Sequence, residues 1–122
     1  MKKIRRDVLC YLRTHRRVWG LTQPDLAALI GFKSANHISR IENGKRDPTV
    51  EVAFACQVIF GIPPSAMFPH VYTLVEEKTM QNIYQLHLAL SQTSSLSGLR
   101  KRELLSLALK RAITKPNILE RV

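Results

Sequence analysis

The sequence predicts an all-α chain in which five short helices form an N-terminal domain and two longer helices follow. Two observations support this fold class. Apolar residues recur at intervals of three and four, which is the spacing of one helix face. Small polar residues and prolines stand where helices would begin, and glycines stand where they would end. We expect the domain to span residues 1–69 and the helical extension to span residues 70–122.

The first helix is expected over residues 6–18. Asp7 suits its first turn, because a carboxylate there complements the positive end of the helix dipole. Leu12 belongs to its inward-facing stripe, and Gly20 ends it. Trp19, just before that glycine, is expected at the edge of the core.

The next helix is expected to begin after Thr22, which is a good N-cap. Asp25 follows three residues later and completes a capping-box pattern, in which each residue accepts a hydrogen bond from the other's backbone. Leu26, Leu29 and Ile30 then lie on one face at helical spacing. Gly31 ends this helix, where a positive φ suits glycine alone.

A second helix of the pair is expected to start at Ser34 as its N-cap. Ile38 and Ile41 face inward at a spacing of three, and Asn43-Gly44 ends the helix. Two short helices joined by a tight turn are typical of a helix-turn-helix, whose second helix enters the DNA major groove.

This stretch resembles the phage-repressor and Cro-like (XRE-type) family of DNA-binding regulators. The residues that carry the resemblance are Leu21-Thr22-Gln23, Leu26-Ala27, Gly31, Ile38-Ser39-Arg40-Ile41-Glu42-Asn43-Gly44 and Pro48. The resemblance implies a five-helix, lambda-repressor-like DNA-binding domain with a C-terminal two-helix extension. The chain departs from the family pattern by one extra residue in Phe32-Lys33, so we expect a longer turn. The alternative is a chance helical hairpin.

Residues near the start of the second helix of the motif would reach base edges in the groove. The candidates are Ala35, Asn36, His37 and Arg40. Asparagine bonds adenine through two hydrogen bonds, arginine bonds guanine in the same way, and alanine touches the thymine methyl group. The alternative is that some of these side chains meet only phosphate or water.

Polar and basic residues around that helix are candidates for phosphate contacts, which supply affinity that depends on salt. They are Gln23, Lys33, Ser34, Ser39, Asn43, Lys45, Arg46 and Arg17, with Arg13 a weaker candidate. The resemblance implies that Gln23 contacts phosphate and also braces a side chain of the recognition helix. It also implies a structural pair between Arg16 and Glu42; the alternative is two independent surface charges.

The remaining helices follow from breaker residues and apolar spacing. A helix over residues 48–60 is expected to be capped by Asp47, with Pro48 at its first position. It is apolar nearly all round, so we expect it to be the most buried helix. A short helix within residues 63–68, a long helix over 70–91 and a last helix over 99–113, ended by Lys115-Pro116-Asn117, complete the chain.

The charge favours a polyanionic partner. The 122 residues carry a formal net charge of +10, and residues 1–48 hold 11 Lys/Arg against 4 Asp/Glu, whereas residues 49–122 hold 8 against 5. The excess therefore lies with the motif, as DNA binding requires. Cys10 and Cys56 are expected to be reduced core thiols in a cytoplasmic protein. We expect no signal peptide, membrane span, metal, cofactor or catalytic set.

Taken together, the sequence predicts a sequence-specific DNA-binding transcriptional regulator that acts as a repressor on a palindromic operator, as a homodimer. Double-stranded DNA is the expected partner, and the sequence does not identify a small-molecule effector. The main alternative is an antitoxin-type interaction protein whose C-terminal helices bind a protein partner. A helix-turn-helix that no longer binds DNA and an enzyme are the remaining alternatives. Residues 70–122 could pack on the first domain, pair with a second chain or bind another protein.

Overall fold

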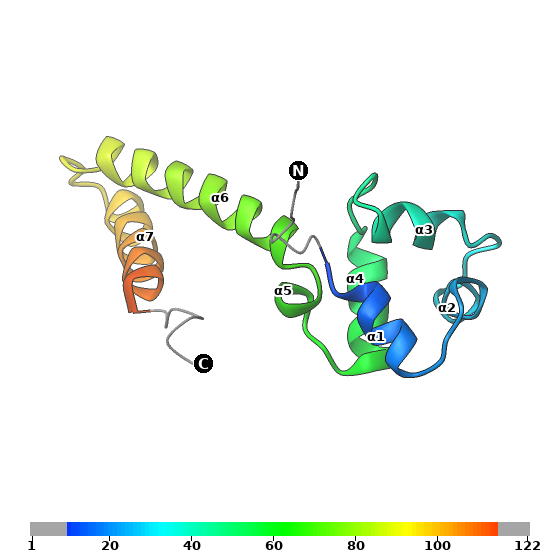
Figure 1. Ribbon diagram of the computed structural model, residues 1–122. Helices are drawn as coiled ribbons and strands as arrows, with labels where there is room; N and C mark the ends of the chain where they lie inside the picture. Colours follow the sequence, from blue (N-terminus) through cyan, green and yellow to red (C-terminus); the bar gives the residue numbers. More distant parts are fainter. Residues whose placement is uncertain (1–9, 115–122) are drawn as a thin grey trace, which may run out of the picture. The chain divides into compact units, whose positions relative to one another are not determined.

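All the regular structure among the described residues is helical, which confirms the predicted fold class (Figure 1). The computed structural model describes residues 10–114. The chain divides into two units, one ending at Leu74 and the other beginning at Val75. The division between a DNA-binding domain and an extension at residue 69 stays a prediction.

The first unit contains α1 (Leu12–Val18), α2 (Gln23–Ile30), α3 (Asn36–Glu42), α4 (Val50–Phe60) and α5 (Pro64–Met67). The 21-residue helix α6 (Pro69–Ala89) begins in this unit and continues into the second. The other described helix of the second unit is α7 (Leu96–Thr114).

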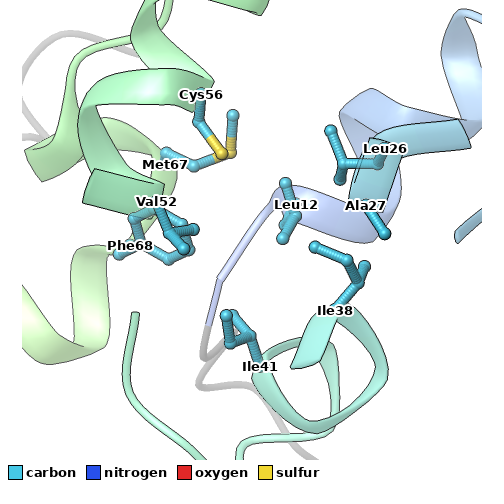
Figure 2. Close-up of a cluster of buried hydrophobic side chains, with 9 residues drawn as sticks. All are labelled: Leu12, Leu26, Ala27, Ile38, Ile41, Val52, Cys56, Met67 and Phe68. Carbon is cyan, nitrogen blue, oxygen red and sulfur yellow. The ribbon is translucent and has the colours of Figure 1, made fainter. Parts of the chain in front are cut away.

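One apolar core joins the five short helices (Figure 2). Its residues are Leu12, Leu26, Ala27, Ile38, Ile41, Val52, Cys56, Met67 and Phe68. Every helix from α1 to α5 contributes at least one of them, so none of these helices can shift without opening the core. The backbone N–H of Tyr11 also donates to the Met67 carbonyl at 2.8 Å, which ties the start of α1 to α5.

The structure confirms the predicted boundaries of α2. The Thr22 hydroxyl accepts the Asp25 N–H at 3.1 Å, and the Asp25 carboxylate accepts the Thr22 N–H at 2.9 Å. These hydrogen bonds lower the pKa of Asp25 below its ordinary value. Gly31 closes the helix at a φ of 104°. The prediction for Leu29 is wrong, because its side chain is 58% exposed while Ala27 is buried in its place.

Helix α1 is shorter in the described residues than the sequence predicts. Residues 6–9, with the proposed cap Asp7, lie outside the described part of the chain. Trp19 is 71% exposed, so its expected place at the edge of the core is wrong. It lies at the C-cap of α1, one residue past the helix, where the chain turns through Gly20 at a φ of 73°.

Two predictions for α4 are wrong. Its N-cap is Thr49, whose hydroxyl accepts the Val52 N–H at 3.2 Å, and not Asp47. It is also not the most buried helix, because two of its residues are buried, as in α2, while Phe54 is 59% exposed and Val58 is 85% exposed. A helix at the surface of a small domain contacts the core with one face only, and the uniformly apolar sequence of α4 did not reveal which face.

The two cysteines are free, as predicted. The Cys10 thiol is half-buried and donates to the Ile41 carbonyl at 3.9 Å. Burial, together with the proximity of Cys10, raises the pKa of Cys56 to about 12. Both thiols therefore remain protonated core residues at neutral pH.

The second unit consists of the C-terminal part of α6 and all of α7. Helix α7 begins three residues earlier than predicted, because the Ser95 hydroxyl accepts the Gly98 N–H at 3.1 Å and caps it. Gly98 is thus inside the helix, and a Cβ there would collide with the Thr93 side chain. The expected end at 115–117 lies outside the described residues. The sequence predicts that one inward face of this helix carries Leu105, Ala108, Leu109, Ala112 and Ile113. This is confirmed at Leu105, which is buried, and is wrong for Ile113, which is 82% exposed.

The position of the α4 cap can be tested by two substitutions. We expect Thr49→Ala to lower the free energy of unfolding by about 1 kcal/mol, because it removes the acceptor for the Val52 N–H. Asp47→Ala is the matched control, because that side chain is exposed and outside the cap. Urea unfolding measures both, and a larger loss for Asp47→Ala would contradict the assignment.

Candidate nucleic-acid interface

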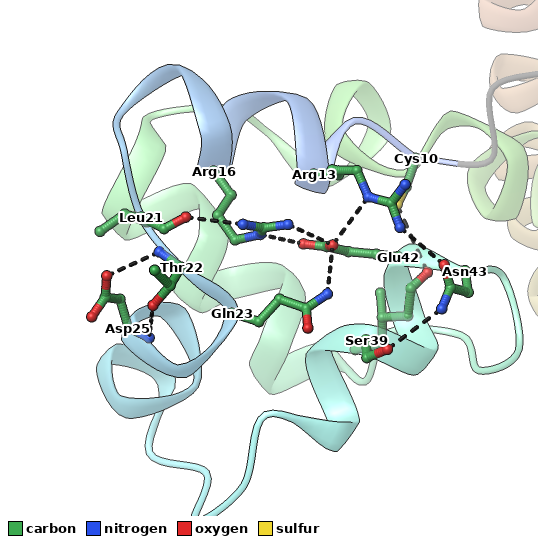
Figure 3. Close-up of polar contacts among 11 residues, drawn as sticks. Cys10, Arg13, Arg16, Leu21, Thr22, Gln23, Asp25, Ser39, Glu42 and Asn43 are labelled. Atoms are coloured by element: carbon green, nitrogen blue, oxygen red, sulfur yellow. Dashed lines mark hydrogen bonds and ion pairs between the residues drawn. The ribbon is translucent and has the colours of Figure 1, made fainter.

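A buried carboxylate at the end of α3 joins three helices (Figure 3). The Glu42 side chain has no exposed surface. Its Oε2 accepts Arg16 Nε at 2.7 Å, and its Oε1 accepts Arg16 Nη2 at 3.0 Å and Gln23 Nε2 at 3.1 Å. Helices α1 and α2 therefore both hold the end of α3 through one side chain.

The predicted pair between Arg16 and Glu42 is confirmed, and two independent surface charges are excluded. The Arg16 side chain is only 9% exposed, and its Nη1 also donates to the Leu21 carbonyl at 2.9 Å. Burial by itself raises the pKa of Glu42, but hydrogen bonds from Arg16, Gln23 and Arg13 outweigh it, so the pKa lies below its ordinary value. The same pairing raises the pKa of Arg16. Both groups are charged at neutral pH, and the two-point geometry fixes their mutual orientation.

Arg13 has a role that the sequence analysis missed. Its Nε lies 3.4 Å from Glu42 Oε1, and its Nη2 donates to Asn43 Oδ1 at 3.0 Å. Asn43 in turn donates from Nδ2 to the Ser39 hydroxyl at 3.4 Å. The signal was the spacing of Arg13 and Arg16, three residues apart and thus on one face of α1. Arg13 connects α1 to the last turn of α3.

The orientation of α3 follows from its two buried isoleucines. Ile38 and Ile41 are 0% and 4% exposed, as predicted. The opposite face of the helix carries Asn36, Ser39, Arg40 and Asn43, which follow one another at intervals of three, one and three. All the apolar anchoring of α3 is thus on one side, and the polar side chains with hydrogen-bonding capacity are on the other.

The start of α3 differs by one residue from the prediction. Ala35 occupies the N-cap position that the sequence assigned to Ser34. The Ser34 hydroxyl still accepts a backbone N–H, that of Asn36 at 3.0 Å. Five residues, 31–35, connect α2 and α3. Phe32 packs against the core within this longer turn, which anchors the extra residue.

The four candidate base-contacting residues differ in how far they are exposed. Asn36 and Arg40 are exposed and lie one turn apart on the outward face of α3. Ala35 is half-buried at the N-cap. His37 is also half-buried, and its ring is nearly perpendicular to the ring of Phe32 at a centroid distance of 4.5 Å. The structure therefore brings Asn36 and Arg40 together at the surface, whereas Ala35 and His37 partly face the domain.

The candidate phosphate-contacting residues surround α3. Lys33 and Ser34 precede the helix, Lys45 and Arg46 follow it, and all four are exposed. Arg17 is exposed on α1, whereas Gln23 is half-buried and donates to Glu42. Ser39 and Asn43 are engaged with each other as described above. Three of the exposed basic candidates thus lie directly before or after the recognition helix, and the fourth, Arg17, lies on α1.

Residues 20–66 match the sequence model of a protein family described as Helix-turn-helix. No curated protein and no solved structure matches the chain. In the described residues 10–114, no three His, Cys, Asp or Glu side chains form a group that would hold a metal ion. No described helix is both long enough and apolar enough to cross a bilayer.

The fold and this match define a DNA-binding transcriptional regulator of the helix-turn-helix class. Within that class, residues 20–66 form a helix-turn-helix domain of the XRE type, as their sequence predicted. Helix α2 is the first helix of the motif, and α3 is its recognition helix.

We call Glu42 and its donors Arg13, Arg16 and Gln23 the Glu42 cluster. Its importance can be tested by removing the charge of Glu42. We expect Glu42→Gln to lower the free energy of unfolding by about 3 kcal/mol at pH 7, because Arg16 would remain buried without its counter-charge. The pKa of Glu42 is lower in the folded chain than its ordinary value of 4.5, so this stabilisation is present above that pH. It is lost as the pH falls through the folded-state pKa of Glu42. The free energies of unfolding of the unaltered protein and of Glu42→Gln should then converge.

Glu51→Gln is the matched control for this experiment. Glu51 is exposed in the first turn of α4, so its substitution should change stability by only about 0.5 kcal/mol or less. Urea unfolding across a pH series measures all three proteins. An equal loss for both variants, or a constant difference at every pH, would contradict the role assigned to Glu42.

Proposed function

We propose that this regulator is a repressor that binds a palindromic operator as a homodimer. The observation that supports the proposal is the presentation of α3. Its apolar face is buried, its end is fixed by Glu42, and its outward face presents Asn36 and Arg40 to a partner. A recognition helix held in this way can enter the major groove as one rigid element.

Base recognition is assigned to the outward face and the start of α3. Asn36 would bond an adenine edge and Arg40 a guanine edge, each through two hydrogen bonds. Ala35 would contact a thymine methyl group, and His37 a base or a phosphate. Asn36 and Arg40 are the stronger pair, because both are exposed and separated by one helical turn.

Affinity is assigned to the residues that surround the helix. Lys33, Lys45 and Arg46 are exposed cations at its two ends, where they can neutralise phosphates. Each neutralised phosphate releases bound counterions, so binding should weaken steeply with salt. Ser34, Ser39, Asn43, Gln23 and Arg17 complete the proposed set of phosphate contacts. Arg13 and Gln23 would act together on α3, because both contact Glu42.

The homodimer follows from the size of one recognition helix. A single helix reads only a few base pairs, and two copies on a symmetric site read two half-sites roughly one helical turn apart. We assign residues 70–122 to holding the two copies together. Repression by blocking access to the promoter is the simplest consequence, and we assign the protein to the cytoplasm.

Selection of bound sequences from a random DNA pool tests this function. We expect a palindromic consensus, with two protomers in the complex on the selected site. Strong binding without a consensus would show that the protein binds DNA without sequence specificity. Absence of binding at moderate salt would contradict the proposal and favour the alternative of a protein-interaction module.

The separate roles of base and phosphate contacts give a paired prediction. Arg40→Ala should weaken binding to the preferred site by about 1–3 kcal/mol and relax discrimination at one base pair. Lys45→Ala should instead weaken binding to all sequences alike. It should also reduce the slope of log affinity against log salt concentration by about one, because one phosphate contact is lost. Binding titrations at several salt concentrations distinguish the two, and unchanged base preference in Arg40→Ala would show that the register proposed for α3 is wrong.

A further inference from the structure

A row of hydrogen bonds runs from α1 along the last turn of the recognition helix (Figure 3). Arg13 donates from Nη2 to Asn43 Oδ1 at 3.0 Å, and Asn43 donates from Nδ2 to the Ser39 hydroxyl at 3.4 Å. We call these three residues the Arg13 relay. Ser39 and Asn43 are also proposed phosphate contacts, so a phosphate would meet two side chains that are already bonded to each other. The hydrogens that the relay leaves available decide what these side chains can bind.

The Arg13 relay has one chemical direction. A guanidinium offers only N–H donors, so Asn43 can face Arg13 only with its carbonyl oxygen. The NH₂ group of Asn43 then lies on the other side of the amide, where one of its two hydrogens bonds Ser39. A hydroxyl that accepts a hydrogen bond points its own proton elsewhere. The relay therefore leaves one amide hydrogen of Asn43 and the hydroxyl hydrogen of Ser39 for a further partner.

The guanidinium of Arg13 is held in place by a second acceptor. Its Nε lies 3.4 Å from Glu42 Oε1, and the Glu42 side chain has no exposed surface, whereas the Arg13 side chain is 45% exposed. The planar fork of an arginine can hold two acceptors at fixed positions, which the point charge of a lysine cannot do. The direction in which the Asn43 amide faces thus depends on the shape of the guanidinium and not on its charge alone.

We propose that Arg13 is a positioning residue for DNA binding, which orients Asn43 and Ser39 so that both donate to phosphate oxygens beside the recognition helix. This role rests on the DNA binding proposed above, and not on the palindrome or the homodimer. Phosphate oxygens are acceptors, and Asn and Ser side chains are among their usual donors. The two hydrogens that the relay leaves available match that chemistry. Arg13 itself touches no phosphate and acts through Asn43.

Orientation before binding strengthens such a contact in two ways. The amide of an unrestrained asparagine must be ordered when it binds, and that cost is avoided when Arg13 has already fixed it. Hydrogen bonds in a row also polarise one another, so a positive guanidinium at the start makes the hydrogens at the end better donors. The relay should therefore add affinity for every DNA sequence alike, because phosphate contacts carry no sequence information directly.

A double-mutant cycle between Arg13 and Asn43 tests the positioning role. Arg13→Lys keeps the positive charge but lacks the fork that holds Asn43 and Glu42 together. Alone, it should weaken binding to a DNA duplex about three- to tenfold, which is the effect of roughly one lost hydrogen bond. In the Asn43→Ala background it should have no further effect, because the amide that Arg13 orients is absent. Binding titrations of the full-length chains with a labelled duplex measure all four proteins.

Ethylation of single phosphates on the selected site supplies a readout that a merely structural role would not move. An ethylated phosphate loses its charge and blocks an oxygen, so it weakens binding where the protein contacts that phosphate. The phosphate whose ethylation no longer matters in Asn43→Ala should be the same one in Arg13→Lys, with the other phosphates unaffected. A general loosening of α3 would instead alter the effect of several phosphates together.

Thr14→Ala is the matched control for damage to α1. Thr14 is exposed, lies next to Arg13 in the same helix and is outside the relay. Its substitution should leave both the affinity and the ethylation pattern unchanged. Urea unfolding verifies that Arg13→Lys and Asn43→Ala remain folded under the conditions of the titrations.

Three outcomes would overturn the positioning role. They are an equal loss for Arg13→Lys in both backgrounds, an unchanged affinity in Arg13→Lys or Asn43→Ala, and different phosphates affected in the two single variants. If the unaltered chain binds the duplex and any of these results appears, the role of Arg13 alone is wrong. If the unaltered chain binds no duplex DNA at moderate salt, the proposed function fails and the positioning role fails with it.

Discussion

The carboxylate of Glu42 connects the interior of the DNA-binding domain to the face that it presents. It ends the recognition helix, is fully buried, and accepts hydrogen bonds from Arg16 on α1 and Gln23 on α2. A buried charge without partners is strongly unfavourable, so the carboxylate holds its donors as firmly as they hold it. The position of α3 is consequently set by its contacts with neighbouring helices, because its seven residues are too few to form a stable isolated helix.

The apolar core supports this arrangement from the other side. Ile38 and Ile41 enter the same core as Leu12 and Val52, so the buried face of α3 is fixed while its polar face is turned outward. Arg13 adds a connection at the surface through Asn43. A recognition helix with so many fixed points loses little conformational freedom when it binds, which favours affinity. Rigid presentation and a concentration of positive charge around α3 are the two properties that the proposed operator binding uses.

The second unit presents the opposite situation. Its two helices meet near their connecting turn but leave an open groove and a row of exposed leucines. Another surface that covered these side chains would stabilise the unit, so in the proposed homodimer its folding and its association would be coupled. In the proposed homodimer, the DNA-binding domain is rigid before it meets DNA, whereas the extension completes its core when it meets a second copy. This division separates sequence recognition from assembly.

The sequence by itself determined the elements that local chemistry specifies. The capping box of Thr22 and Asp25, the turn at Gly31 and the inward isoleucines of α3 were all predicted, because each depends on residues close together in the chain. The family pattern added the Arg16–Glu42 pair. Local signals misplaced the cap of α4, where Asp47, Pro48 and Thr49 compete, and the start of α7. Only the tertiary structure decided which face of the apolar helix α4 is buried, that Trp19 is exposed, and that Arg13 joins the Glu42 cluster. Those outcomes depend on contacts between residues distant in sequence, and no periodicity within a single helix records them.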